Sequence, residues 1–123
     1  TQRSTLFPYT TLFRSGHSSV TDLAQMDALL SPPGRAGWSP AAHDQRLLDA
    51  LLGAPAPLPP LRFDCGRADG FLHGNRALHQ GLAAAGIAHV YAEHEGGHDW
   101  AYWTRHLEDI LAFFAGVAAR APG

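Results

Sequence analysis

The two residues of this chain with the clearest potential for catalysis are Asp69 and His98. Asp69 is followed by Gly70, and His98 is preceded by Gly96 and Gly97, so each is expected to lie in a turn. A neutral imidazole can take the proton of a hydroxyl nucleophile, and a carboxylate can orient that imidazole and stabilise its charged form. The two residues are therefore candidates for the acid and the general base of nucleophilic catalysis.

Four aromatic residues lie close to these positions in the sequence. Phe71 follows the first turn, and Trp100, Tyr102 and Trp103 follow the second. Aromatic side chains often line sites for small molecules, because they offer a large and rigid apolar surface. We expect these four residues to form the walls of a substrate pocket.

The segments around the candidate residues alternate between strand and helix. The sequence predicts extended segments at Leu61–Cys65 and Ile87–His94, and helices at Asn75–Ala85 and Tyr102–Ala119. Two strands joined by a helix form a parallel βαβ unit. In such sheets the reactive groups lie where strands end, so Asp69 and His98 should meet at the carboxyl edge.

Apolar periodicity predicts the other helices. Residues 21–30 indicate a short helix, and Ser39 followed by Pro40 begins a helix that ends at Gly53. In the last helix, apolar residues recur every three or four positions, so one face should pack on the sheet. These residues are Leu107, Ile110, Leu111, Phe114 and Val117.

About half of the chain resembles the closing segment of a family of serine esterases. The pattern is similar to that of the esterase D and S-formylglutathione hydrolase type, and to their enterochelin esterase and antigen 85 relatives. The matching residues are Asp64, Gly66, Asp69, Phe71, Leu72, Gly96, Gly97, His98, Trp100, Tyr102 and Trp103.

The resemblance implies an α/β-hydrolase fold, with parallel strands and flanking helices, of which this chain is an incomplete C-terminal part. It assigns Asp69 as the acid and His98 as the base of a Ser-Asp-His triad, and gives Asp64 a structural role. The second motif reads Gly-Gly-His-Asp where many S-formylglutathione hydrolases have Gly-Tyr-Asp-His, which favours a general esterase. The expected reaction is hydrolysis of a small ester or thioester through an acyl-enzyme, without a cofactor or a metal.

The N-terminal segment predicts a truncated chain. Residues 5–15 match the in-frame translation of a common short-read sequencing adapter. We therefore interpret residues 1–15 as non-native and residues 16–123 as the C-terminal portion of an esterase domain. A genuine β-rich lead-in is the alternative, because the segment contains threonine and aromatic residues. On the truncated interpretation, the fragment itself is expected to be inactive.

The nucleophile of the triad is expected to lie outside the chain. Residues 16–20, Gly-His-Ser-Ser-Val, match the first three positions of the nucleophile elbow Gly-x-Ser-x-Gly, but the fifth residue is valine. An elbow serine should be followed by a helix and a further strand, yet the sequence between Ser18 and Leu61 has no β-rich run. Ser18 is therefore a weaker candidate for the nucleophile than a serine outside the chain. It is expected to lie just after a strand whose beginning is missing.

Two other chemistries use residues of the same region. His89, His94, His98 and Asp99 could suggest a metal site, but they straddle a strand end and a turn instead of sharing one helix face, so no metal is assigned. Cys65 is the single cysteine, and a lone cysteine at a buried strand end is more often a small core residue than a nucleophile.

Two other functions stay open as alternatives. One is a noncatalytic α/β module that binds a partner through Trp38, Trp100 and Trp103. The other is a peptidase or acyltransferase on the same fold. A formal charge of −2 and 16% charged residues give no basic surface for nucleic acid, and no apolar run reaches the length of a membrane span.

Overall fold

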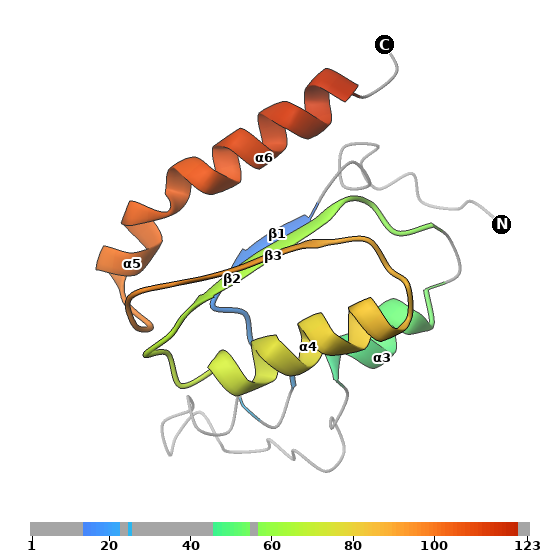
Figure 1. Cartoon of the computed structure of the whole chain (residues 1–123), viewed down its shortest axis with the longest axis horizontal. Helices are drawn as coiled ribbons and strands as arrows, with labels where there is room; N and C mark the ends of the chain where they lie inside the picture. Colours follow the sequence, from blue (N-terminus) through green and yellow to red (C-terminus); the bar gives the residue numbers. More distant parts are fainter. Residues whose placement is uncertain (1–13, 23–24, 26–45, 55–56, 121–123) are drawn as a thin grey trace, which may run out of the picture.

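The computed structural model describes residues 14–22, 25, 46–54 and 57–120. This part of the chain contains a three-stranded parallel sheet with the strand order β1-β2-β3, and helices cover both faces (Figure 1). β1 spans Arg14–His17, β2 spans Leu61–Gly66 and β3 spans Val90–His94. The predicted class of parallel strands with flanking helices is confirmed.

The helices form one layer on each side of the sheet (Figure 1). Helices α3 (Leu47–Leu52) and α4 (Leu72–Ala84) cover one face, and α5 (Trp100–Arg105) and α6 (Leu107–Arg120) lie on the other. None of the described helices combines the length and the apolar character that crossing a bilayer requires.

The two faces of the sheet differ at the central strand β2, which carries apolar side chains on one face and polar side chains on the other. Leu61 and Phe63 pack with Leu78 and Leu82 of α4 in a buried apolar cluster. Burial of one such side chain contributes about 1.5–3 kcal/mol, so this cluster fixes α4 on the sheet. Because side chains alternate along a strand, the residues of β2 that lie between and directly after Leu61 and Phe63 face the α5 side of the sheet.

Helix α4 begins at Leu72, before the predicted start at Asn75. Asn75 is fully buried inside the helix, where its Nδ2 donates to the carbonyl oxygens of Phe71 and Ser19, each at 2.9 Å. Asparagine is common at helix caps, but here the side chain ties the helix to the segment after β1.

The last helix and the last strand also differ from their predicted bounds. His106 divides the predicted C-terminal helix into α5 and α6. The predicted strand at Ile87–His94 pairs with β2 only from Val90 onward. Residues 87–89 are not paired, because the N–H of Ile87 still donates to the carbonyl oxygen of Leu82 at the end of α4.

The expected packing of the last helix is only partly correct. Val117 is buried, and Ile110 and Phe114 are half-buried. Leu107 and Leu111 are 50% and 56% exposed, so for these two leucines the predicted packing on the sheet is wrong. The apolar stripe of α6 is wider than the part of it that the sheet covers.

Strand β1 begins inside the adapter-like segment, since it contains Arg14 and Ser15. The hydrogen bonds of a strand ladder come from the backbone, so these two residues can pair with β2 whatever their origin. The non-native origin of residues 1–15 stays a prediction. Trp38, residues 40–45 of the expected second helix and most of the helix expected at 21–30 lie outside the described residues.

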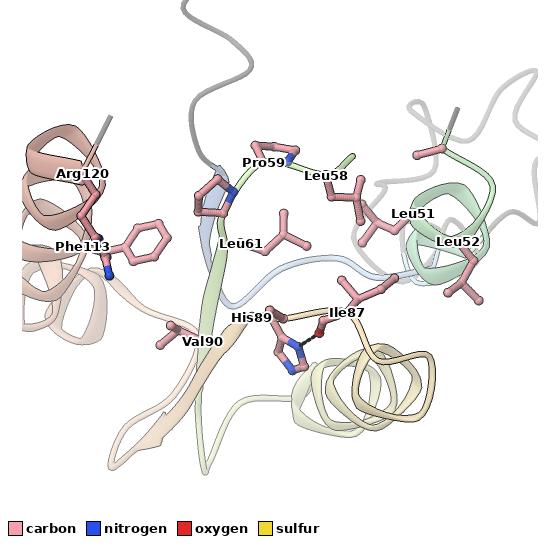
Figure 2. Close-up of a pocket in the computed structure, with 13 residues that line it drawn as sticks. Leu51, Leu52, Leu58, Pro59, Leu61, Ile87, His89, Val90, Phe113 and Arg120 are labelled. Carbon is pink, nitrogen blue, oxygen red and sulfur yellow. Dashed lines mark hydrogen bonds between the residues drawn. The ribbon is translucent and has the colours of Figure 1, made fainter. Parts of the chain in front are cut away.

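A groove of about 700 Å³ lies at the amino ends of β2 and β3 (Figure 2). Leu51, Leu58 and Leu61 line one part of it, and Val90 and Phe113 line another. The groove is at the edge of the sheet opposite to the turns that carry Asp69 and His98, so it is not the pocket predicted from the sequence.

Candidate active site

Asp69 lies in the turn between β2 and α4. Its N–H donates to the carbonyl oxygen of Gly66 at 3.1 Å, and its Oδ1 accepts the N–H of Phe71 at 2.8 Å. Its side chain is fully buried, at 0% exposed. These local hydrogen bonds orient the carboxylate, and Oδ2 points to the neighbouring loop.

The loops after β2 and β3 approach each other closely. The N–H of Ala68 donates to the carbonyl oxygen of Gly96 at 2.9 Å. A Cβ on Gly66 would collide with that same oxygen, so only glycine fits there. Gly96 has a φ of +128°, and a Cβ on it would lie 2.8 Å from Cδ2 of Tyr102. The two glycines therefore allow the loops that carry Asp69 and His98 to meet.

His98 lies within hydrogen-bond distance of Asp69. Its Nδ1 is 3.0 Å from Oδ2 of Asp69, and its side chain is 37% exposed. The next residue, Asp99, caps α5, because its Oδ1 accepts the N–H of Tyr102 at 2.8 Å. A neutral imidazole that donates from Nδ1 to Asp69 keeps a lone pair on Nε2, which is the form that a general base requires.

Aromatic rings surround this imidazole. Phe71 and Trp103 each meet the ring of His98 in an edge-to-face arrangement, with centroids 5.0 Å apart. Trp100 packs against Trp103 in the same manner at 5.1 Å, and it is 78% exposed. Three of the four predicted wall residues therefore lie around His98 or extend the surface beside it.

Tyr102, the fourth predicted wall residue, lies in the interior instead. It is 2% exposed, and its hydroxyl donates to Oδ1 of Asp64 at 2.6 Å. Its position is a correction to the expected pocket. The ring lies under the loop of His98, because Tyr102 occupies the face of α5 that is turned to the sheet.

Asp64 binds three polar side chains in the interior. Besides Tyr102, Nδ1 of His17 lies 2.7 Å from the carboxylate, and Nη1 of Arg62 donates to Oδ2 at 2.5 Å. Burial by itself would raise the pKa of Asp64, but hydrogen bonds from these three partners outweigh it and lower the pKa below its ordinary value. The expected structural role of Asp64 agrees with this position.

Sequence reasoning did not find the partners of Asp64. Arg62 and Asp64 stand two positions apart in β2, so they share one face of the sheet. This spacing in the sequence could have indicated that the two side chains interact. His17 could not be found in this way, because its pairing with Asp64 depends on the register of β1 against β2.

Ser18 lies beside the candidate site at the end of β1. It is 3% exposed and has a φ of 49°, and its N–H donates to the carbonyl oxygen of Asp64 at 2.8 Å. Its Oγ accepts a hydrogen bond from Nε1 of Trp103 at 3.4 Å. Within the described residues, no hydrogen bond joins this hydroxyl to His98.

Cys65 has no exposed surface. Burial raises the pKa of its thiol to about 12, and the nearby charge of Asp69 acts in the same direction. The thiol therefore stays protonated at neutral pH, whereas a cysteine nucleophile must be a thiolate. This position fits the core role that the sequence favours.

The residues considered above as metal ligands do not converge. His89 faces His79, with Nε2 and Nδ1 2.7 Å apart, on the α4 side of the sheet. His98 faces Asp69, and Asp99 caps α5. The part of the chain that the structure describes therefore does not form the cluster suggested by the sequence.

Parallel strands between two helical layers, with a carboxylate and an imidazole on neighbouring loops, define this chain as part of an α/β-hydrolase fold. Two solved structures share it. They are a ferulic acid esterase, with a TM-score of 0.64 and 21% identity, and an S-formylglutathione hydrolase from Staphylococcus aureus, with a TM-score of 0.68 and 21% identity. The first alignment covers 85% of this chain and 41% of the other chain, and the second covers 82% and 43%.

Within this class the sequence is similar to that of an esterase. Over 72 residues the chain is 36% identical to an acetyl esterase from Caldicellulosiruptor saccharolyticus, and this match covers 58% of the chain and 27% of that esterase. No family model matches the chain. The matched parts cover 41% and 43% of the two solved chains and 27% of the acetyl esterase.

Proposed function

We propose that this chain supplies the acid and the base of a carboxylesterase, with Asp69 orienting His98 and His98 acting as general base. The contact of 3.0 Å between Nδ1 of His98 and Oδ2 of Asp69 is the observation that carries the proposal. A base within hydrogen-bond reach of its orienting carboxylate is the arrangement that serine hydrolases use.

The surroundings of the pair support this assignment. The carboxylate of Asp69 is buried and accepts the backbone N–H of Phe71, whereas His98 is 37% exposed and can reach a substrate. Phe71 and Trp103 limit the rotation of the imidazole, because both rings pack against it edge to face. A fixed base with one free nitrogen lowers the entropic cost of proton transfer.

We further propose that the nucleophilic serine belongs to a part of the protein outside these 123 residues. The similar solved structures are more than twice as long as the part that this chain matches. Ser18 is a poor alternative, because its hydroxyl is buried and bonded to Trp103. On this proposal, hydroxyl attack on an ester or thioester forms an acyl-enzyme, and His98 carries the proton in both half-reactions.

The test uses the complete protein, expressed from the gene extended upstream in the source DNA, with p-nitrophenyl acetate as substrate. Asp69→Asn and His98→Gln should each lower kcat by about 10³–10⁴-fold, because either change removes the oriented base. KM should change much less. The 123-residue chain alone should not hydrolyse the ester faster than free imidazole does.

Two exposed residues provide matched controls. Asp49→Asn and His73→Gln make the same chemical changes away from the site, and both should leave kcat within about twofold. A complete protein that keeps full activity after Asp69→Asn would refute the triad assignment. Hydrolysis by the short chain that depends on Ser18 would refute an external nucleophile.

A noncatalytic binding module remains the second candidate, because Trp100 is 78% exposed and extends the aromatic surface beside His98. The same extended gene separates the two functions. A Gly-x-Ser-x-Gly elbow after a strand supports the enzyme, whereas its lack supports the binding module.

A further inference from the structure

A second group of titratable side chains lies on the α5–α6 side of the sheet. His94 is the last residue of β3, His106 joins α5 to α6, and Asp109 lies in the first turn of α6. One nitrogen or oxygen atom from each residue lies within 4.8 Å of the other two. The proposed acid–base pair uses none of them.

The carboxylate of Asp109 already lies near both imidazoles. Its Oδ2 is 3.2 Å from Nδ1 of His106 and 3.7 Å from Nε2 of His94. Ligands of a tetrahedral zinc ion, with bonds of about 2.0–2.1 Å, are separated by roughly 3.3 Å. The present separations of these atoms are therefore close to ligand spacing, although their directions are not yet those of ligands.

Both imidazoles also have a nitrogen without a hydrogen-bond partner among the described residues. Nε2 of His94 and Nε2 of His106 are buried and accept or donate no hydrogen bond within the described residues. Buried polar atoms are normally paired, because leaving them unpaired costs free energy. A cation at Nε2 of His94, which lies 3.7 Å from Oδ2 of Asp109, would use a lone pair that the protein leaves unsatisfied. At His106 the nitrogen that contacts Asp109 is Nδ1, so a cation there would replace the contact of 3.2 Å between these two side chains.

The rings must rotate to bind such an ion. They are stacked with centroids 4.0 Å apart and planes inclined by 10°, whereas a metal ion lies in the plane of each imidazole that it binds. Rotation about one Cβ–Cγ bond changes this angle without moving the backbone. The side chain of Asp109 is 47% exposed, so an ion and a water ligand can enter from solvent.

We propose that His94, His106 and Asp109 bind a divalent transition-metal ion of the zinc type, with water as the fourth ligand. Two imidazoles and one carboxylate are ligands that suit zinc better than calcium or magnesium. The ion would hold the start of α6 against the end of β3. This inference does not depend on the proposed esterase function.

The experiment titrates the complete, tag-free protein with zinc chloride in a calorimeter, and with cobalt chloride by visible absorption. The wild-type chain should bind one equivalent, with the cobalt bands of a tetrahedral site, and zinc should raise its thermal unfolding midpoint. Asp109→Asn should weaken the affinity at least about tenfold, and His106→Gln should do the same. Asp109 is exposed, so its variant tests the site without disturbing the core.

His79→Gln is the matched control, because His79 belongs to another pair of histidines, with His89 at 2.7 Å. That variant should bind zinc as the wild-type chain does. Absence of zinc binding by the wild-type chain would overturn the proposal. Unchanged affinity in both Asp109→Asn and His106→Gln would also overturn it, as would an equal loss in His79→Gln.

Discussion

The two ring nitrogens of His98 have different surroundings, and this difference gives the residue its proposed role. Nδ1 faces a buried carboxylate at 3.0 Å, while 37% of the side chain is exposed. A carboxylate at Nδ1 favours the tautomer that leaves Nε2 unprotonated. The same contact stabilises the imidazolium that forms when the base accepts a proton.

The hydroxyl of Tyr102 should contribute to stability through Asp64. We expect Tyr102→Phe to lower the free energy of unfolding by about 1–3 kcal/mol at pH 7, because the buried carboxylate loses a donor. The pKa of Asp64 is lowered in the folded chain, so its stabilising effect is present above the ordinary pKa of 3.8 and lost as pH falls through the folded value. The variant should raise that pKa and shift acid unfolding to higher pH, measured by circular dichroism.

Tyr91→Phe is the control for this prediction. Its hydroxyl donates to Glu93 at 2.8 Å, but Glu93 also binds the guanidinium of Arg76 and is partly exposed. The carboxylate of Glu93 therefore keeps a strong partner when the hydroxyl is removed. Equal effects of the two substitutions on acid unfolding would contradict the special role of Asp64.

At the scale of elements, the contact between the two loops is what brings Asp69 and His98 together. Gly96→Ala should lower the free energy of unfolding by about 1–3 kcal/mol, because φ is +128° there and the new Cβ would meet Tyr102. Urea unfolding measures this change. Gly70→Ala is the matched control and should be nearly neutral, because Gly70 has no atom within 4 Å of the added Cβ.

The elements could be predicted from the sequence better than their ends. Apolar runs in the sequence predict the strand at Leu61–Cys65 and the parallel βαβ unit, because each run must be buried by one strand or one helix. The start of α4 was missed because Asn75 binds the distant carbonyl of Ser19, a tertiary contact. The division at His106 was missed because apolar periodicity continues from α5 to α6 across it.

The candidate site shows the same limit. The proximity of Asp69 and His98 could be predicted, because residue type, glycine turns and strand ends all place them at one edge of the sheet. The interior position of Tyr102 could not, because Trp100, Tyr102 and Trp103 are close in sequence, and only the rotation of α5 decides which ring faces the sheet. The grouping of His94 with His106 and Asp109 depends on where α6 begins relative to the end of β3.

At the scale of the whole molecule, the described part leaves large apolar side chains in contact with solvent. Val90 is 49% exposed, Leu107 50% and Leu111 56%, and the groove in Figure 2 has a mainly apolar lining. Exposed apolar surface of this kind promotes association. In a larger domain, further chain could cover part of it.

We therefore expect the isolated chain to self-associate at micromolar concentration and to bind the dye ANS. Sedimentation velocity over a range of concentrations measures the first property, and fluorescence measures the second. Leu107→Gln combined with Leu111→Gln should reduce both, because the two leucines are exposed and their replacement removes apolar surface without opening a cavity. A chain that stays monomeric and binds no dye would contradict this expectation.

The order of β2, α4, β3 and α5 along the chain has a consequence for assembly. One short crossover separates the acid from the base, so little loop-closure entropy is lost when they meet. β1 pairs with β2 beside this unit, but both loops that carry the two residues belong to the unit itself. On the proposed function, a polypeptide that begins near β1 would carry the acid and the base together, and a second polypeptide would have to supply the hydroxyl and the oxyanion hole.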